Sequence, residues 1–173
     1  METEKAIRTR RTHKAFGARP VERAVLDELF ELARWAPNHH LTNPWRFRVI
    51  GPAAREQLMA LAESEAQGAA AKLARAPTLV AVSAALRRED DREDREDLLA
   101  TAVAAYVVLL GAHAHGLAGY WRTVPLLAEP RARALLHTPA HEEPVALLYL
   151  GDPVQEQRVP ERAPTGDFVS YLP

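Results

Sequence analysis

The segment RTRRTHKAF, residues 8–16, gathers four cations and two threonine hydroxyls into nine residues. Guanidinium groups match phosphate oxygens in pairs, and a neighbouring hydroxyl can add a short hydrogen bond. The residues of this candidate cradle for one phosphate monoester are Arg10, Arg11, Thr12 and Lys14. A solvated basic turn would have the same composition, so the segment by itself leaves both interpretations open.

A loop rich in ring side chains is the second candidate. WAPNHHLTNPW, residues 35–45, places two indoles and two imidazoles around a proline-bounded loop. Loops fixed at both ends by rigid elements often carry binding groups, and this mixture of groups suits a planar heteroaromatic ligand. The alternative for the two tryptophans is a place in the core, which we expect for Trp45. His39 and His40 are adjacent and point in different directions, so they fit a core less well.

The segment GYWRTV, residues 119–124, is the third candidate. A strand that ends in Arg122 and Thr123 could hold a cation beside the electron-rich edge of a ring, where negative charge develops. An ordinary edge strand with Arg122 in solvent is the alternative.

Several other chemistries lack support in the sequence. His113 and His115 are two residues apart, a spacing that sends them to different faces of a helix, so a joint metal site is not expected. The chain has no G-x-S-x-G, Walker or G-x-G-x-x-G motif, and its zero cysteines exclude thiolate ligands and a cysteine nucleophile. The segment Arg87–Asp97 holds seven acids and four arginines without an apolar face, which predicts a solvated loop or helix extension.

Composition bounds the class of protein. A chain of 173 residues, 47% of them hydrophobic, is long enough for one packed domain, which we expect over residues 1–173. Its 22 basic and 23 acidic residues argue against bulk nucleic-acid binding, so any anion site must be local. The longest apolar run, around residues 103–111, is about half of a bilayer span, and no export-signal pattern opens the sequence. We therefore expect a cytoplasmic protein that does not cross a membrane.

Hydrophobic periodicity places the elements that would position these groups. Apolar residues at steps of three and four predict a helix over Val21–Ala36, and alternation from Trp45 predicts a strand that ends at Gly51. Pro52 opens a second helix to about Gly68. The remaining predicted elements are a buried strand over 76–84, a buried helix over 98–115, a short strand after a turn in 116–123, a brief helix over 130–137 and a buried strand over 144–151.

Prolines dominate the chain from Asp152 onward, which predicts an extended arm over about 152–173. Apolar residues that are costly to leave in water nevertheless occur near its end: Phe168, Val169, Tyr171 and Leu172. We expect these side chains to pack on another surface, such as a second subunit.

Taken in order, these segments resemble the nitroreductase family of flavoenzymes, particularly its short, minimal members. The early R-R-[ST] pattern of the family corresponds to Arg10-Arg11-Thr12, and its A-P…Q-P-W-x-F-x-V segment to APNHHLTNPWRFRV. GLAGYWRT resembles its G-x-G-x-x-W-R-[ST], VALLYLGDP resembles its last strand, and APTGDFVSYL resembles the C-terminus of small members. The five pieces occur in the correct order and cover nearly the whole chain.

The resemblance implies an FMN-binding, intertwined homodimer of α+β architecture, with a mostly antiparallel sheet between helices and a flavin at each end of the subunit interface. By similarity, the residues at the phosphate and ribityl oxygens would be Arg10, Arg11, Thr12 and Lys14. Those that approach the flavin from the partner subunit would be Trp35 and His39. Those along the ring system would be Arg122, Thr123 and Val124. Whether Arg162 adds a phosphate contact stays open.

The implied reaction is FMN-dependent oxidation of NADH or NADPH. Hydride would pass through the flavin to nitroaromatic, quinone or similar electron-poor acceptors in a ping-pong cycle. The cofactor supplies this chemistry, so no side chain is assigned as catalytic. The alternatives are another flavin reaction on the same scaffold, such as reductive dehalogenation or ene reduction, a non-catalytic flavin carrier or sensor, and a nucleic-acid-binding module that uses residues 8–14.

Three departures from the family pattern bear on the site. Asn43 stands where the family usually has glutamine, and its amide is shorter. Val124 stands where close relatives often have glycine, so the backbone there would approach a flavin less freely. The insertion that roofs the active site in larger members is missing, so we expect an open pocket.

Overall fold

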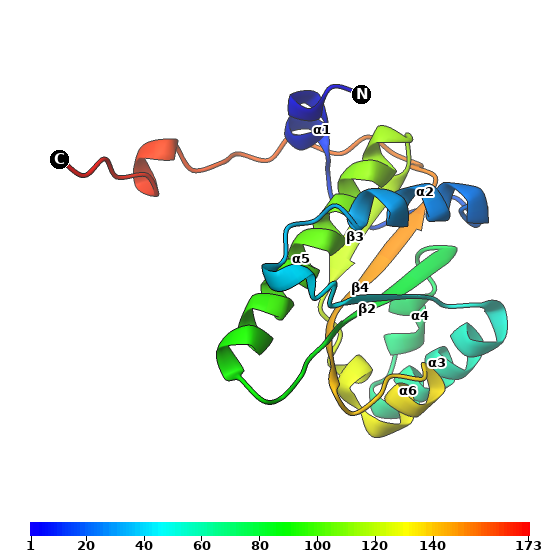
Figure 1. Ribbon diagram of the computed structural model, residues 1–173. Coiled ribbons are helices and arrows are strands. Elements are labelled where there is room, and N and C mark those ends of the chain that lie inside the picture. Colours follow the sequence, from blue (N-terminus) through cyan, green and yellow to red (C-terminus); the bar gives the residue numbers. More distant parts are fainter.

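The computed structural model describes residues 1–173 and contains one four-stranded sheet between two layers of helices (Figure 1). The strands are β1 (Trp45–Val49), β2 (Thr78–Ala85), β3 (Ala118–Arg122) and β4 (Glu142–Gly151). They lie in the order β1-β2-β4-β3, and every neighbouring pair is antiparallel. β3 is therefore an edge strand. The predicted α+β class with an antiparallel sheet between helices is confirmed.

Helices cover both faces of this sheet. They are α1 (Thr3–Thr9), α2 (Arg23–Ala33), α3 (Pro52–Glu65), α4 (Ala69–Leu73), α5 (Asp91–Ala114) and α6 (Pro130–Leu135), with short 3-10 turns at His39–Leu41, Pro125–Ala128 and Thr165–Asp167. α2 and α5 lie on one face, and α3, α4 and α6 lie on the other (Figure 1). Alternation along β4 serves both layers, because Leu148 packs toward α5 and the next residue, Tyr149, packs into the opposite cluster.

The predicted elements occur with shifted ends. The helix expected over Val21–Ala36 is α2, which is shorter at both ends. The helix expected from Pro52 to about Gly68 is α3, which already ends at Glu65. α4 begins after Gly68, whose φ of 75° favours glycine, and was not predicted. α1 was not predicted, because it is seven residues long and buries only Ala6, which leaves no apolar period to detect.

α5 begins earlier than its apolar sequence indicated. Asp90 caps it, since the side chain accepts hydrogen bonds from the N–H groups of Arg92 and Glu93 at 2.8 and 3.4 Å. The helix extension predicted for the acidic run is thus confirmed from Asp91 onward, but the expectation of full solvation is wrong. Asp94 and Asp97 are only 7% and 3% exposed, because their spacing turns both toward the protein.

α5 is also long and apolar enough, by length and composition, to cross a membrane. Half of its most apolar window is buried inside the protein, where Ala104, Ala105 and Val108 have no exposed surface. Core helices commonly pass the same test, and the expectation of a cytoplasmic protein stays a prediction.

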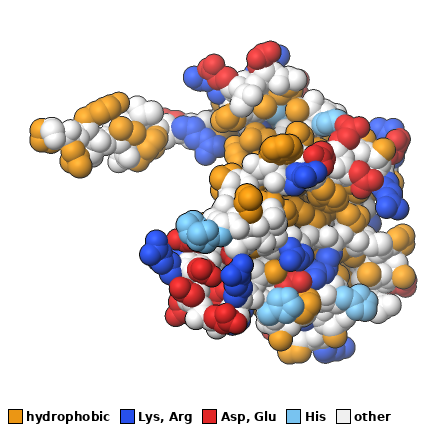
Figure 2. Space-filling model, in the orientation of Figure 1, with side chains coloured by type: hydrophobic (Ala, Val, Ile, Leu, Met, Phe, Trp, Pro, Cys, Tyr) orange, Lys and Arg blue, Asp and Glu red, His pale blue; other side chains and the backbone are white.

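The segment after Pro153 forms an arm that leaves the body of the molecule (Figure 1). Hydrophobic side chains lie along it (Figure 2), and Phe168, Tyr171 and Leu172 are 69%, 94% and 89% exposed. Within one chain these side chains have no core to pack against. Their packing on a second subunit, and the division into one domain with an arm, stay predictions.

A buried ion pair ties three strands together. Arg48 of β1 donates hydrogen bonds to both carboxylate oxygens of Glu142 at 2.7 and 2.9 Å, and the hydroxyl of Ser83 in β2 donates to the same carboxylate. Burial alone would raise the pKa of Glu142, but the hydrogen bonds from Arg48 and Ser83 and the charges of Arg48 and Arg46 outweigh it. The pKa of Glu142 therefore lies below its ordinary value.

Replacing Glu142 with glutamine should lower the free energy of unfolding at pH 7 by about 3 kcal/mol, because Arg48 loses its counter-charge. The pKa of this carboxylate is lower in the folded state than its unfolded value of about 4.3, so its stabilising effect is present above that value and is lost as pH falls through the folded pKa. Urea unfolding should show a gap between wild type and Glu142→Gln that shrinks below about pH 4.

Asp27→Asn is the control, because Asp27 and Arg23 form an exposed pair at 3.7 Å. It should change stability by less than about 0.5 kcal/mol. A gap for Glu142→Gln that is the same at neutral and acid pH would contradict the assigned role of the charge.

Candidate functional site

A cavity of about 300 Å³ lies between the end of α1 and the first part of the C-terminal arm. The residues that line it are Arg10, Arg11, Thr12, Gln157, Arg158, Pro160 and Arg162. Four arginines from two distant parts of the sequence thus converge, and no carboxylate is among the lining residues. Like charges at this density repel one another, so the arginine cavity is suited to an anion.

Backbone pairing fixes the N-terminal half of the arginine cavity. Thr12 forms a parallel bridge with Gly119 at the start of β3, and the N–H of His13 donates to the carbonyl of Gly119 at 3.1 Å. Gly119 has no room for a side chain, since a Cβ there would lie 2.8 Å from a methyl group of Leu109 in α5. The bridge and the hydrogen bond to Gly119 therefore position the segment that carries Arg10 and Arg11.

The two N-terminal arginines differ in their own contacts. The guanidinium of Arg10 lies over the ring of Tyr106, 5.7 Å from its centroid, and its Nε is buried without a hydrogen-bond partner. Arg11 donates from Nη1 to the carbonyls of Arg8 and Arg10 at 2.7 and 2.9 Å, so part of its guanidinium closes the end of α1. Arg10 thus retains an unused buried donor, which fits a ligand with acceptor oxygens.

Two histidines lie beside these arginines. Nε2 of His113 is 2.7 Å from the hydroxyl of Thr9, and Nδ1 of His13 is buried without a partner. Burial lowers the pKa of His13, and His113 and Arg10 lower it further. Burial, Arg10 and Arg11 likewise lower the pKa of His113. Both imidazoles are therefore neutral at pH 7, and the positive charge of the cavity comes from its arginines.

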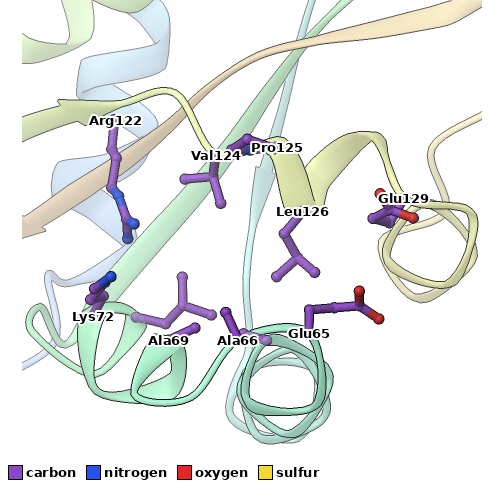
Figure 3. Close-up of a pocket in the computed structure, with 11 residues that line it drawn as sticks. Glu65, Ala66, Ala69, Lys72, Arg122, Val124, Pro125, Leu126 and Glu129 are labelled. Carbon is purple, nitrogen blue, oxygen red and sulfur yellow. The ribbon is translucent and has the colours of Figure 1, made fainter.

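A second cavity, of about 310 Å³, lies beyond the other end of β3, against α3 and α4 (Figure 3). Lys72 of α4 and Arg122 of β3 point toward each other on one side of it, and Glu65 and Glu129 lie on the other (Figure 3). Arg122 donates to the hydroxyl of Tyr149 at 3.1 Å. Burial raises the pKa of Tyr149, so the hydroxyl stays neutral and orients the guanidinium.

Val124 also lines this second cavity (Figure 3). Its φ of −124° and ψ of 106° are ordinary extended values, so the backbone does not need glycine here. The difference from close relatives is therefore a difference of side-chain volume at the cavity wall.

Lys72 and Arg158 were not among the site residues predicted from the sequence. Lys72 lies in a helix of five residues, and Arg158 lies in an arm that shows only its prolines. A single basic residue in so short a helix or in an irregular segment has no periodic signal. The one available hint was that Lys72 is one of only three lysines, with Lys5 and Lys14.

Other predicted site residues lie apart from both cavities within one chain. Trp35 is 78% exposed, His39 is exposed, and neither lines the arginine cavity or the second cavity. Lys14 and Thr123 are likewise exposed and line neither. Trp45, in contrast, packs against the core between the sheet and α2, as expected.

The loop over residues 38–43 has a strained backbone. His40, Leu41 and Asn43 have φ values of 49°, 51° and 47°, a left-handed conformation that costs about 1–2 kcal/mol for such residues. Within the loop, the side chain of Asn38 accepts the N–H of Asn43 at 2.9 Å, and the amide of Asn43 donates to the carbonyl of Leu41 at 2.7 Å. The short amide of Asn43 is therefore used inside the loop itself.

Comparisons with known proteins give one consistent result. The model of the Nitroreductase family matches residues 7–152. YfhC of Bacillus subtilis, assigned as an NAD(P)H nitroreductase, is 26% identical over 174 residues, which cover 93% of this chain and 89% of YfhC. YdjA of Escherichia coli K12, assigned in the same way, is 28% identical over 161 residues, which cover 85% of this chain and 86% of YdjA.

Solved structures agree in fold. The nitroreductase-like family protein of Bacillus cereus superposes with a TM-score of 0.89 at 22% identity, over 99% of this chain and 96% of that chain. The FMN and NADPH-dependent nitroreductase NfnB of sphigopyxis sp. strain HMH gives a TM-score of 0.82 at 17% identity, over 99% of both chains. At such identities the likeness shows the fold.

Filling the arginine cavity with inorganic phosphate should raise the pKa of His13, because the anion offsets the arginine charge that lowers it. A titration of the His13 C2–H proton signal by NMR, with and without phosphate, measures this change. His141, which directly precedes the first residue of β4 and does not line the arginine cavity, is the control for non-specific effects of the salt. A titration of His13 that phosphate leaves unchanged would place the anion elsewhere.

Proposed function

The chain belongs to the nitroreductase family, and from that premise we propose that it is an FMN-dependent NAD(P)H oxidoreductase that works as a homodimer. The observation that carries the proposal is the cavity of four arginines around the unpartnered Nε of Arg10. A phosphate monoester supplies both the acceptor oxygens and the negative charge that this cavity lacks.

We assign the phosphate to the residues that line the arginine cavity. From the N-terminal segment these are Arg10, Arg11 and Thr12. Arg158 and Arg162 add two cations from the arm, which supports the phosphate contact that stayed open for Arg162 in the sequence. Lys14 lies close by in sequence but outside the cavity lining, so its contact with ribityl oxygens stays a prediction.

β3 sets the separation between the phosphate and the ring. From Gly119 to Arg122 the strand rises about 10 Å, so the two ends of one elongated ligand would contact the two cavities. Beyond the bridge to Thr12, the outer backbone groups of this edge strand have no strand partner and can bond the polar edge of a ring. Thr123 and Val124 would then lie along the ring system.

When bound, FMN takes hydride from NADH or NADPH and passes it to a nitroaromatic, quinone or similar acceptor in a ping-pong cycle. The protein supplies position and charge. Lys72 and Arg122, which line one cavity, would offer two cations to the negative charge that develops on a reduced flavin ring. No side chain is assigned as a nucleophile or a general base.

Exposed apolar side chains support the homodimer. Trp35 and Leu41 are 78% and 77% exposed at the end of α2 and in the following loop, and Leu99 of α5 is 61% exposed. Together with the apolar end of the arm, these large exposed apolar side chains favour contact with a second subunit. Trp35 and His39 line neither the arginine cavity nor the second cavity of their own chain. In such a dimer they would instead approach the flavin of the partner subunit.

Purified protein should be yellow, release FMN on denaturation, and oxidise NADH or NADPH steadily when a quinone is added. Double-reciprocal plots at several quinone concentrations should be parallel, because reductant and acceptor use the same place in turn. Bound flavin without turnover would indicate a carrier or sensor. Protein that takes up no added FMN would overturn the proposal.

Arg10→Ala should weaken FMN binding about 10- to 100-fold, because charge-assisted hydrogen bonds contribute about 1.5–3 kcal/mol. Riboflavin, which lacks the phosphate, should bind the variant and wild type alike. Titrations that follow flavin fluorescence measure both affinities. Arg8→Ala is the matched control, since Arg8 is exposed two residues away and pairs with Glu4 at 2.8 Å. An equal loss of FMN and riboflavin affinity in Arg10→Ala would instead indicate a role in the fold.

A further inference from the structure

We infer that Thr42 and Asp97 are positioning residues whose hydrogen bond holds the strained 38–43 loop in the form that presents His39 to the partner subunit's flavin. This inference rests on the proposed function. It adds a residue pair that touches neither cavity and acts through the loop.

The loop needs an external restraint. His40, Leu41 and Asn43 are left-handed, and the loop contains no glycine that would adopt this conformation freely. Strain of this kind persists only where the surroundings over-determine the backbone. The hydrogen bonds of Asn38 and Asn43 connect neighbouring parts of the loop, so they shape it without fixing it to the body of the protein.

Thr42 supplies that restraint. Its Oγ1 donates to Oδ1 of Asp97 at 2.5 Å, and no other side chain of residues 38–43 has a hydrogen bond to a distant element. Asp97 is 3% exposed and lies on α5, the helix packed against the sheet. The second half of the loop is therefore fixed to a buried residue of α5.

The side chains that this loop displays are free to meet a ligand or a partner. His39 and Leu99 line an open cavity of about 430 Å³ between the loop and α5, and Leu41 is 77% exposed. Burying a carboxylate under such a loop is costly, and so is the strained backbone above it. The loop contributes little to the core, so neither the buried carboxylate nor the strained backbone is explained by packing. This combination is typical of a binding loop that a rigid scaffold positions.

Thr42→Val removes the hydroxyl and keeps the size of the side chain. In the FMN-loaded variant the KM for benzoquinone should rise about tenfold while FMN affinity stays near wild type, because the phosphate cavity is untouched. The visible circular dichroism of bound FMN should change. Amide hydrogen exchange over residues 38–43 should become faster both with and without FMN. Thr42→Ser keeps the hydroxyl and should restore all three properties.

Thr101→Val is the matched control. Thr101 lies on α5 about one turn beyond Asp97, is fully buried, and its hydroxyl has no partner. The same chemical change there should leave KM, circular dichroism and loop exchange unaltered. Asp97→Asn, which keeps an acceptor oxygen and removes the charge, should give a smaller change of the same kind and provides the test if Thr42→Val does not fold.

Two failures can be told apart. If Thr42→Val has a wild-type KM and wild-type loop exchange, the positioning role is overturned while the flavin assignment stays intact. The same holds for Asp97→Asn if Thr42→Val does not fold. A variant that only unfolds at lower temperature would do the same. Wild-type protein that takes up no FMN would overturn the proposed function and this role with it, whereas loop exchange would still show whether Thr42 holds the loop.

Discussion

Four guanidinium groups in one cavity repel one another, and the fold holds them together despite this repulsion. Two of them follow α1 and two lie in the arm, so distant parts of the chain meet at a cluster of like charge. The cavity lining includes no carboxylate that would neutralise these charges. An anionic ligand would supply the negative charge that the lining of this cavity lacks.

The edge strand β3 connects the arginine cavity with the second cavity. The strand starts beside the arginine cavity, where Gly119 admits close packing of Leu109, and it ends at Arg122 beside the second cavity. Its inner side is held by β4, and its outer side is open beyond one bridge. An elongated ligand with an anionic end and a planar polar end matches such an arrangement, since one rigid strand fixes the distance between the two contacts.

Buried polar groups in the molecule serve two different purposes. The carboxylate of Glu142 is fully compensated by Arg48 and Ser83, and it joins three strands of the sheet. Asp97 accepts a hydrogen bond from the hydroxyl of Thr42 and lies beneath a loop that contains left-handed residues. The first arrangement stabilises the sheet. The second holds an exposed segment in a conformation that costs free energy, and such strain is common at binding sites.

Local patterns in the sequence determined much of this protein. Alternation around Phe47, the apolar run before Gly151 and the three- and four-residue steps of α2 predicted their elements, because each pattern lies within one element. Arg10 and Arg11 were recognisable as a candidate phosphate site because they are adjacent. The family followed from the order of such pieces.

Only the tertiary structure decided which isolated charges belong to the site. Arg158 and Asp97 stand in polar segments, and Lys72 stands in a short alanine-rich helix, so in the sequence each looks like any solvated charge. Their roles depend on groups far away in sequence: Arg122 for Lys72, Arg10 for Arg158 and Thr42 for Asp97. The energy of a charge depends on its burial and its neighbours, and both are set when the chain folds.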